Sequence, residues 1–144
     1  MHHGDTEPQI TDAAIKQIVA LPNLAYLNCI SQPLLSNSTL EIVAKSKTIT
    51  RIGFPGVALD DDGVAHLASM HQMVSLSLNN TAVSDFSVDC LLGLSKLRVL
   101  DVLQTKITLQ GMRLLANGLP ELRRFQYSNR QITNERLTSR DINF

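Results

Sequence analysis

The chain has 144 residues, of which 44% are hydrophobic and 4% aromatic, and it contains no tryptophan. This length predicts one domain, residues 1–144. The composition predicts a core built from leucine, isoleucine and valine. Its 13 basic and 13 acidic residues give a formal net charge of zero, which excludes a strongly basic or acidic protein. No apolar run reaches the roughly 18 residues of a membrane span, so no span is predicted.

The first structural unit is expected to follow a polar lead-in at residues 1–8. It begins at Ile10, and the hydroxyl of the next residue, Thr11, can cap the first turn of a helix. That helix carries apolar residues at helical spacing: Ile15, Ile18 and Val19. From Leu24 to Cys29 the apolar residues then alternate with polar ones, which predicts a strand with one buried face.

The same unit recurs every 24 or 25 residues. The apolar residue before the cap recurs as Ile10, Leu35, Leu59, Val83, Ile107 and Ile132, and the cap as Thr11, Ser36, Asp60, Ser84, Thr108 and Thr133. An apolar helix residue recurs as Ile15, Leu40, Val64, Val88, Met112 and Leu137. The strands recur as Leu24/Leu27/Cys29, Ile49/Ile52/Phe54, Met73/Leu76/Leu78, Leu97/Leu100/Val102 and Leu122/Phe125/Tyr127. The pattern predicts about 5.5 repeats from about residue 10, with residues 131–144 as a partial terminal repeat.

A period of about 24 residues with an L-x-x-L-x-L strand resembles the leucine-rich repeat family. The helix start Ile10-Thr11-Asp12-Ala13-Ala14-Ile15 is similar to the I-T-D-x-x-[LI] variant, found in intracellular F-box-associated and ribonuclease-inhibitor-like proteins. The resemblance implies an α/β solenoid with short parallel strands on a concave face and helices on the convex face. The family's Asn or Thr after the strand is present only as Thr81 and Thr105, so no continuous asparagine ladder is expected.

Three local features depart from the repeat. In the second unit Ser46 replaces the usual leucine at the helix end, and Pro55-Gly56 predicts a turn directly after the strand. An extra residue around Ile30–Leu34 predicts a bulge after the first strand. The run Asp60-Asp61-Asp62 is interpreted as the cap and first turn of a helix, where acidic residues suit the helix dipole, rather than as a cation site.

The sequence contains no recognisable catalytic or cofactor motif. It has no nucleophile elbow, glycine-rich phosphate loop, HExxH or CxxC, and His66 and His71 are too badly spaced to share a helix face. Cys29 and Cys90 lie more than two repeats apart and are interpreted as small buried apolar groups without a disulfide. We therefore expect no enzyme activity, no small-molecule substrate, no metal and no cofactor. The polar start Met1-His2-His3-Gly4-Asp5 lacks a signal peptide, so an intracellular setting is expected, its compartment left open.

The candidate binding surface consists of the strand residues that alternate with the buried leucines and so point outward on the concave face. Those predicted to contact a partner are Tyr26, Asn28, Arg51, Ser75, Ser77, Asn79, Val99, Asp101, Leu103, Arg124 and Gln126. Tyrosine and arginine are enriched at protein interfaces, and no column is uniformly basic or aromatic as a nucleic-acid groove would favour.

The functional hypothesis is a non-catalytic protein-interaction module or scaffold subunit that binds a protein through the concave face. Two alternatives stay open. The repeats look like those that follow F-box motifs, which suggests the substrate-recognition part of a ubiquitin-ligase adaptor. The basic residues are concentrated after residue 95, with nine there against four before it, which suggests an RNA-associated protein that uses its C-terminal half.

Overall fold

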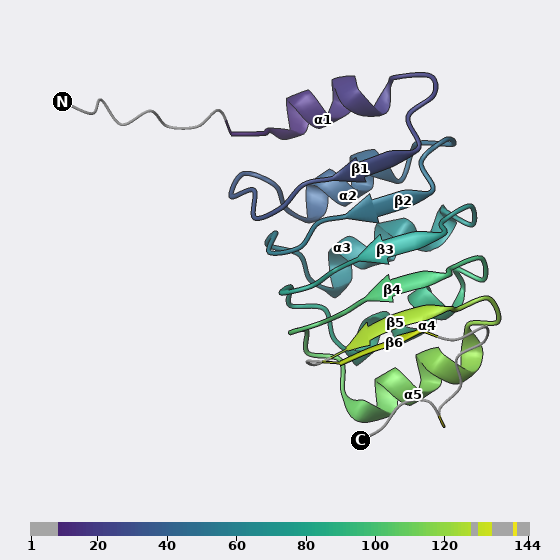
Figure 1. Cartoon of the computed structure of the whole chain (residues 1–144). Helices are drawn as coiled ribbons and strands as arrows, with labels where there is room; N and C mark the ends of the chain where they lie inside the picture. Colours follow the sequence, from purple (N-terminus) through teal and green to yellow (C-terminus); the bar gives the residue numbers. More distant parts are fainter. Residues whose placement is uncertain (1–8, 128–129, 134–139, 141–144) are drawn as a thin grey trace.

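The computed structural model describes residues 9–127, 130–133 and 140 as an α/β fold in which a single sheet is covered on one face by helices (Figure 1). The first half comprises α1 (Asp12–Val19), β1 (Tyr26–Asn28), α2 (Asn37–Val43), β2 (Arg51–Gly53), α3 (Asp61–Ala65), the 3₁₀ turn η1 (His66–Ser69) and β3 (Ser75–Ser77). The second half comprises the 3₁₀ turn η2 (Asp85–Ser87), α4 (Val88–Leu92), β4 (Val99–Asp101), α5 (Leu109–Gly118), β5 (Arg124–Tyr127) and β6 (Arg130–Thr133).

The six strands lie in the sheet in their order along the chain, and β1 to β5 run parallel. Tyr26 is paired with Arg51, Arg51 with Ser75, Ser75 with Val99 and Val99 with Arg124. Each step is 24 or 25 residues, the predicted period. Parallel neighbours need a crossover connection, and here a helix or 3₁₀ segment behind the sheet returns the chain to the start of the next strand (Figure 1).

The predicted core positions are buried in columns that run from strand to strand. The central strand residues Leu27, Ile52, Leu76, Leu100 and Phe125 are in register and between 0% and 8% exposed. A second buried column contains Cys29, Phe54, Leu78, Val102 and Tyr127, and the helices contribute Ile15, Leu40, Val64, Val88 and Met112. The buried strand face is therefore confirmed for all five parallel strands, although in β2 the alternating position Gly53 is buried as well.

Five of the six predicted caps begin helical segments. Thr11 Oγ1 accepts from Ala14 N, Asp60 from Asp62 N, Ser84 from Phe86 N and Thr108 from Gly111 N, at 3.0 to 3.3 Å. Ser36 precedes α2, and its backbone N–H donates to Thr39 Oγ1 at 3.1 Å. These bonds satisfy backbone donors that a helix start would otherwise leave without partners.

The residue after each cap joins successive units through its side chain, which the sequence pattern did not reveal. We call the four residues Asp12, Asn37, Asp61 and Asp85 the cap ladder. Asp12 accepts from Ser38 and Thr39, and Asn37 exchanges two hydrogen bonds with Asp60. Asp61 accepts from Ser84 and Ser87, and Asp85 accepts from the backbone and hydroxyl of Thr108. Each ladder residue thus bonds to the helix start of the next unit.

Small residues three positions after the caps make room for the ladder. A Cβ atom added to Gly63 would lie 2.2 Å from Asn37 Oδ1, and one added to Gly111 would lie 2.4 Å from Asp85 Oδ1. At the corresponding positions Thr39 and Ser87 are buried and donate their hydroxyls to Asp12 and Asp61. The position is therefore occupied either by glycine, which leaves space, or by a hydroxyl that bonds to the ladder.

The end of the chain differs from the predicted partial sixth repeat. Ile132 and Thr133, expected to precede and cap a helix, belong to β6, which pairs antiparallel with β5, Ile132 opposite Phe125. Asp85 is the last residue of the cap ladder. In the next unit Leu109 follows the cap Thr108, and its side chain has no polar group that could bond to a following helix start. Leu137, Ile142 and Phe144, the other residues expected to contribute at this end, lie outside the described residues.

The departures seen in the sequence have structural explanations. Ser46 is buried, and its hydroxyl accepts from the backbone N–H groups of Thr48 and Ile49, which stabilises the turn into β2. After each of the first four strands the chain turns through one residue of positive φ: Ser31, Gly56, Asn80 and Gln104. Cys29 is buried as expected, whereas Cys90 is only partly buried, and both thiols are free.

The pKa of Asp61 follows from its place in the cap ladder. Burial acts to raise this pKa, but hydrogen bonds from Ser84 and Ser87 and the charge of Lys106 outweigh burial and lower it below the usual 3.8. A carboxylate with a lowered folded-state pKa contributes stability that is present above its unfolded-state pKa and is lost as the pH falls through the folded-state value. The ladder is therefore expected to weaken in acid.

Replacing Asp61 by alanine is expected to destabilise the protein by about 2–3 kcal/mol at neutral pH, because charged hydrogen bonds are lost and the buried Ser87 hydroxyl loses its acceptor. Urea unfolding of Asp61→Ala measures the loss, which should shrink below about pH 4. The control is Asp62→Ala, an exposed neighbour that should change stability by less than about 0.5 kcal/mol. Equal effects of the two substitutions would contradict the ladder.

Candidate functional site

The sheet face opposite the helices carries every residue that the sequence placed at the binding surface. We call it the open face; it is made of three rows across the strands. The first row is Tyr26, Arg51, Ser75, Val99 and Arg124; the second is Asn28, Gly53, Ser77, Asp101 and Gln126; the third is Ile30, Pro55, Asn79 and Leu103. Tyr26, Asn28 and Arg51 are exposed, and the other predicted contact residues are half-buried.

One residue of the open face is buried, contrary to the expectation that it points into solvent. Gly53 is covered by its neighbours: a Cβ atom added there would lie 2.5 Å from Asn28 Oδ1 and 3.7 Å from Ser77 Cβ. The absence of a side chain at Gly53 therefore lets Asn28 lie over β2. Any side chain at this position would displace that amide.

The first row lines a shallow depression of ≈ 370 Å³ at the strand starts. Two of its lining residues, Val74 and Arg98, were not predicted, because they lie just before β3 and β4 rather than at alternating strand positions. Arg98 adds a third guanidinium beside Arg51 and Arg124. The signal in the sequence was that Arg98 directly precedes its strand, whereas Arg51 and Arg124 begin theirs.

The second row contains a buried carboxylate oxygen without a hydrogen-bond partner among the described residues. Asp101 has a side chain that is 14% exposed, and its Oδ2 lies 3.8 Å from Arg124 Nη2. Within the described residues its Oδ1 is buried and has no hydrogen-bond partner. Burial raises the pKa of Asp101, and the positive charge of Arg124 only partly offsets this. The carboxylate is thus held on the open face at a cost in stability.

Part of the third row supports the sheet rather than facing a ligand. Asn79 Oδ1 accepts a hydrogen bond from Leu103 N at 2.7 Å, which joins the ends of β3 and β4. Ile30 in the third row is 59% exposed, and Tyr26 in the first row is 58% exposed. Both lie on or next to β1, so the β1 edge of the open face is more apolar than the β5 edge.

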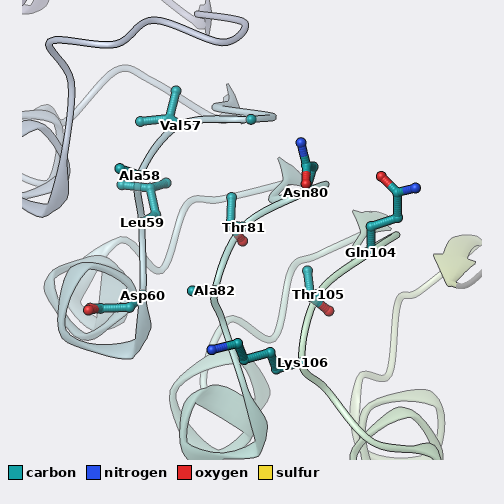
Figure 2. A pocket seen from close by; sticks show the side chains of 11 residues that line it. Val57, Ala58, Leu59, Asp60, Asn80, Thr81, Ala82, Gln104, Thr105 and Lys106 are labelled. Carbon is teal, nitrogen blue, oxygen red and sulfur yellow. The ribbon is translucent and has the colours of Figure 1, made fainter.

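A second depression, of ≈ 590 Å³, lies between three successive loops at the other ends of the strands (Figure 2). Figure 2 shows Asn80 and Gln104 at the tips of adjacent turns and Lys106 beside the loop that contains Ala82. Three polar groups in its wall serve the framework: Thr81 and Thr105 donate to the carbonyls of Leu78 and Val102, and Asp60 caps α3. The other polar lining residues, Asn80, Gln104 and Lys106, are exposed.

The helical side has two exposed features of its own. A depression of ≈ 440 Å³ lies between the ends of α1 and α2 and is lined by Lys16, Lys45 and Lys47 together with Leu21, which is 54% exposed. Phe86 in η2 is 91% exposed beside the acidic start of α3. Neither feature was predicted, because each combines residues from different units.

Within residues 9–127, 130–133 and 140, no cluster of three or more histidine, cysteine, aspartate or glutamate residues could hold a metal ion. Over the same residues no helix is long and apolar enough to cross a bilayer. Comparison of the chain with models of protein families and with curated proteins gives no match.

Replacing Asp101 by asparagine is expected to raise the melting temperature at pH 7, because the amide carries no charge to desolvate. The folded-state pKa of Asp101 is raised above the unfolded-state value, so wild-type stability falls as the pH rises through the interval between the two. The advantage of Asp101→Asn should therefore vanish as the pH falls below about 4. Thermal unfolding across pH 3–7 measures it, and an unchanged or lower melting temperature at pH 7 would contradict a net cost of the carboxylate.

Proposed function

We propose that this chain is a leucine-rich repeat solenoid and that it acts as a non-catalytic module that binds a protein through the open face. The family assignment is supported by the parallel register of 24 or 25 residues, the buried L-x-x-L-x-L positions and the caps at five helical starts. In such a stack each unit contacts only its neighbours, and the strand face that helices do not cover is available to a partner.

The observation that carries the binding proposal is the position of Asp101. Among the described residues, the carboxylate oxygen Oδ1 of Asp101 on the open face is the one buried side-chain oxygen or nitrogen without a hydrogen-bond partner. Costly groups of this kind concentrate where function requires them. The first row also contains the exposed Tyr26 and Arg51 and the half-buried Arg124, and tyrosine and arginine are residue types often found as anchors in protein interfaces.

The dimensions of the open face favour a small contact. Five strands spaced about 4.8 Å apart span about 19 Å, and the rows from position 26 to position 30 cover about 13 Å. The product, about 250 Å² as a flat projection, is small compared with the roughly 800 Å² of accessible surface that each partner buries in a standard interface. A partner would therefore bind either by an extended segment or by also contacting the loops that flank the sheet.

Blocking the middle of the open face is expected to abolish partner binding without unfolding the protein. Ser77 lies at the centre of the second row and is half-buried, so Ser77→Tyr places a ring where a partner would lie. Affinity purification from the native source with quantitative mass spectrometry compares this variant with wild type.

The matched control is Ala68→Tyr, which adds the same ring to an exposed position of η1 on the helical side. A partner lost with Ser77→Tyr and retained with Ala68→Tyr supports the proposal. If every partner survives Ser77→Tyr at an unchanged melting temperature, the open face is not the binding surface. Loss with Ala68→Tyr alone would place binding on the helices.

A further inference from the structure

The depression in the first row is lined by three arginines and no acidic residue. Its wall consists of Tyr26, Arg51, Val74, Ser75, Arg98, Val99 and Arg124. Serine and valine form the floor between Arg51 on β2 and Arg124 on β5, three strand spacings or about 14 Å apart. The concentration of positive charge over small side chains differs from the rest of the open face, whose second and third rows contain no basic residue within the described chain.

The three guanidinium groups have little of their hydrogen-bonding capacity used. Arg98 Nε lies 3.7 Å from Glu121 Oε2, and Arg124 Nη2 lies 3.8 Å from Asp101 Oδ2. Both distances exceed the 2.7–2.9 Å of a charged hydrogen bond. Arg51 is exposed and forms no ion pair with any described residue. An arginine presents five donors in a planar fork that suits a carboxylate, so the depression has unused capacity for several carboxylates.

We propose that this depression binds a short acidic peptide segment of the protein partner, its carboxylates on Arg51, Arg98 and Arg124 and an apolar side chain on Val99. This inference rests on the proposed function and specifies the partner's chemistry. At about 3.3 Å per residue, an extended segment of about six residues crosses the 19 Å width of the five strands. The open face is wide enough for such a peptide to bind without contacting the loops that flank the sheet.

The same features disfavour a nucleic acid as the occupant. Single strands bind by stacking successive bases on aromatic side chains along a basic groove, and Tyr26 is the one aromatic residue on the open face within the described chain. Asp101 of the second row lies directly beside Arg124 of the first row, and its negative charge would repel a continuous phosphate backbone. A peptide can place its acidic residues on the arginines and a neutral residue opposite Asp101.

The test uses a fluorescein-labelled octapeptide of glutamates with a central leucine, and measures its binding to the full chain by fluorescence polarisation. Binding is expected to weaken by about 10-fold or more in Arg51→Glu/Arg98→Glu, because two attractive pairs become repulsive. Both positions are exposed, so the fold should be retained, which the melting temperature checks. Arg124→Gln is a second variant that reverses no charge beside Asp101 and should also weaken binding.

The matched control is Lys16→Glu/Lys45→Glu, which changes the net charge equally but lies in the depression between α1 and α2. It should leave the affinity within about twofold, apart from the long-range effect of net charge, which salt screens. Replacing every glutamate of the peptide by glutamine should abolish binding. A fall in affinity for Lys16→Glu/Lys45→Glu as large as that for Arg51→Glu/Arg98→Glu, or binding of the glutamine peptide as tight as that of the acidic one, would overturn the proposed site.

Three other results would overturn the inference. They are no binding of the acidic octapeptide, more than tenfold preference for the same peptide with phosphoserine in place of glutamate, and displacement of the octapeptide by a ten-nucleotide RNA that binds more tightly. None of them decides the proposed function, because Ser77→Tyr blocks the second row and does not involve the arginines. A partner that is lost with Ser77→Tyr but still binds Arg51→Glu/Arg98→Glu would contradict the acidic-segment inference and leave the proposed function standing.

Discussion

The structure depends on the hydrogen bonds that Asp12, Asn37, Asp61 and Asp85 make with the start of the next helical segment. Parallel strands joined by long crossovers bury apolar columns, but burial is non-directional and does not by itself fix how one unit is seated on the next. A carboxylate held by backbone and hydroxyl donors is directional. The cap ladder therefore sets the register on the helical side, while the parallel backbone pairs set it on the strand side.

This division leaves most of the open face outside the framework, apart from Asn79, which joins the ends of β3 and β4, and Asn28, which covers Gly53. Caps, buried hydroxyls and the turn residues use their polar groups within the framework, whereas the arginines of the first row remain exposed or weakly paired. The unfavourable group, Asp101, also lies on this face. A surface that contributes little to folding and carries a group that opposes it is the surface on which binding can be selected. That distribution of stabilising and destabilising groups connects the fold to the proposed function.

The sheet differs at its β1 edge and beyond β5. At the C-terminal end β6 pairs antiparallel with β5, so the backbone groups of β5 are not left open to a further strand. At the N-terminal end β1 has no neighbour on its outer side within the described residues, and Tyr26, Ile30 and Leu34 beside it are all more than half exposed. The change from parallel to antiparallel pairing after β5 coincides with the apolar Leu109 at the position that carries a polar ladder residue in the four preceding units.

The sequence by itself determined the period, the buried columns and the caps, because burial on one strand face and capping of one helix turn are local consequences of residue type and spacing. It also placed the predicted contact residues on one face. Only the tertiary structure decided that Asp61 reaches Ser84, that Arg98 joins Arg51 and Arg124 around one depression, that Asn28 covers Gly53, and that Thr133 lies in an antiparallel strand. Each of these depends on the distance between side chains from different units, and that distance is set by how the units stack, which a linear pattern does not specify.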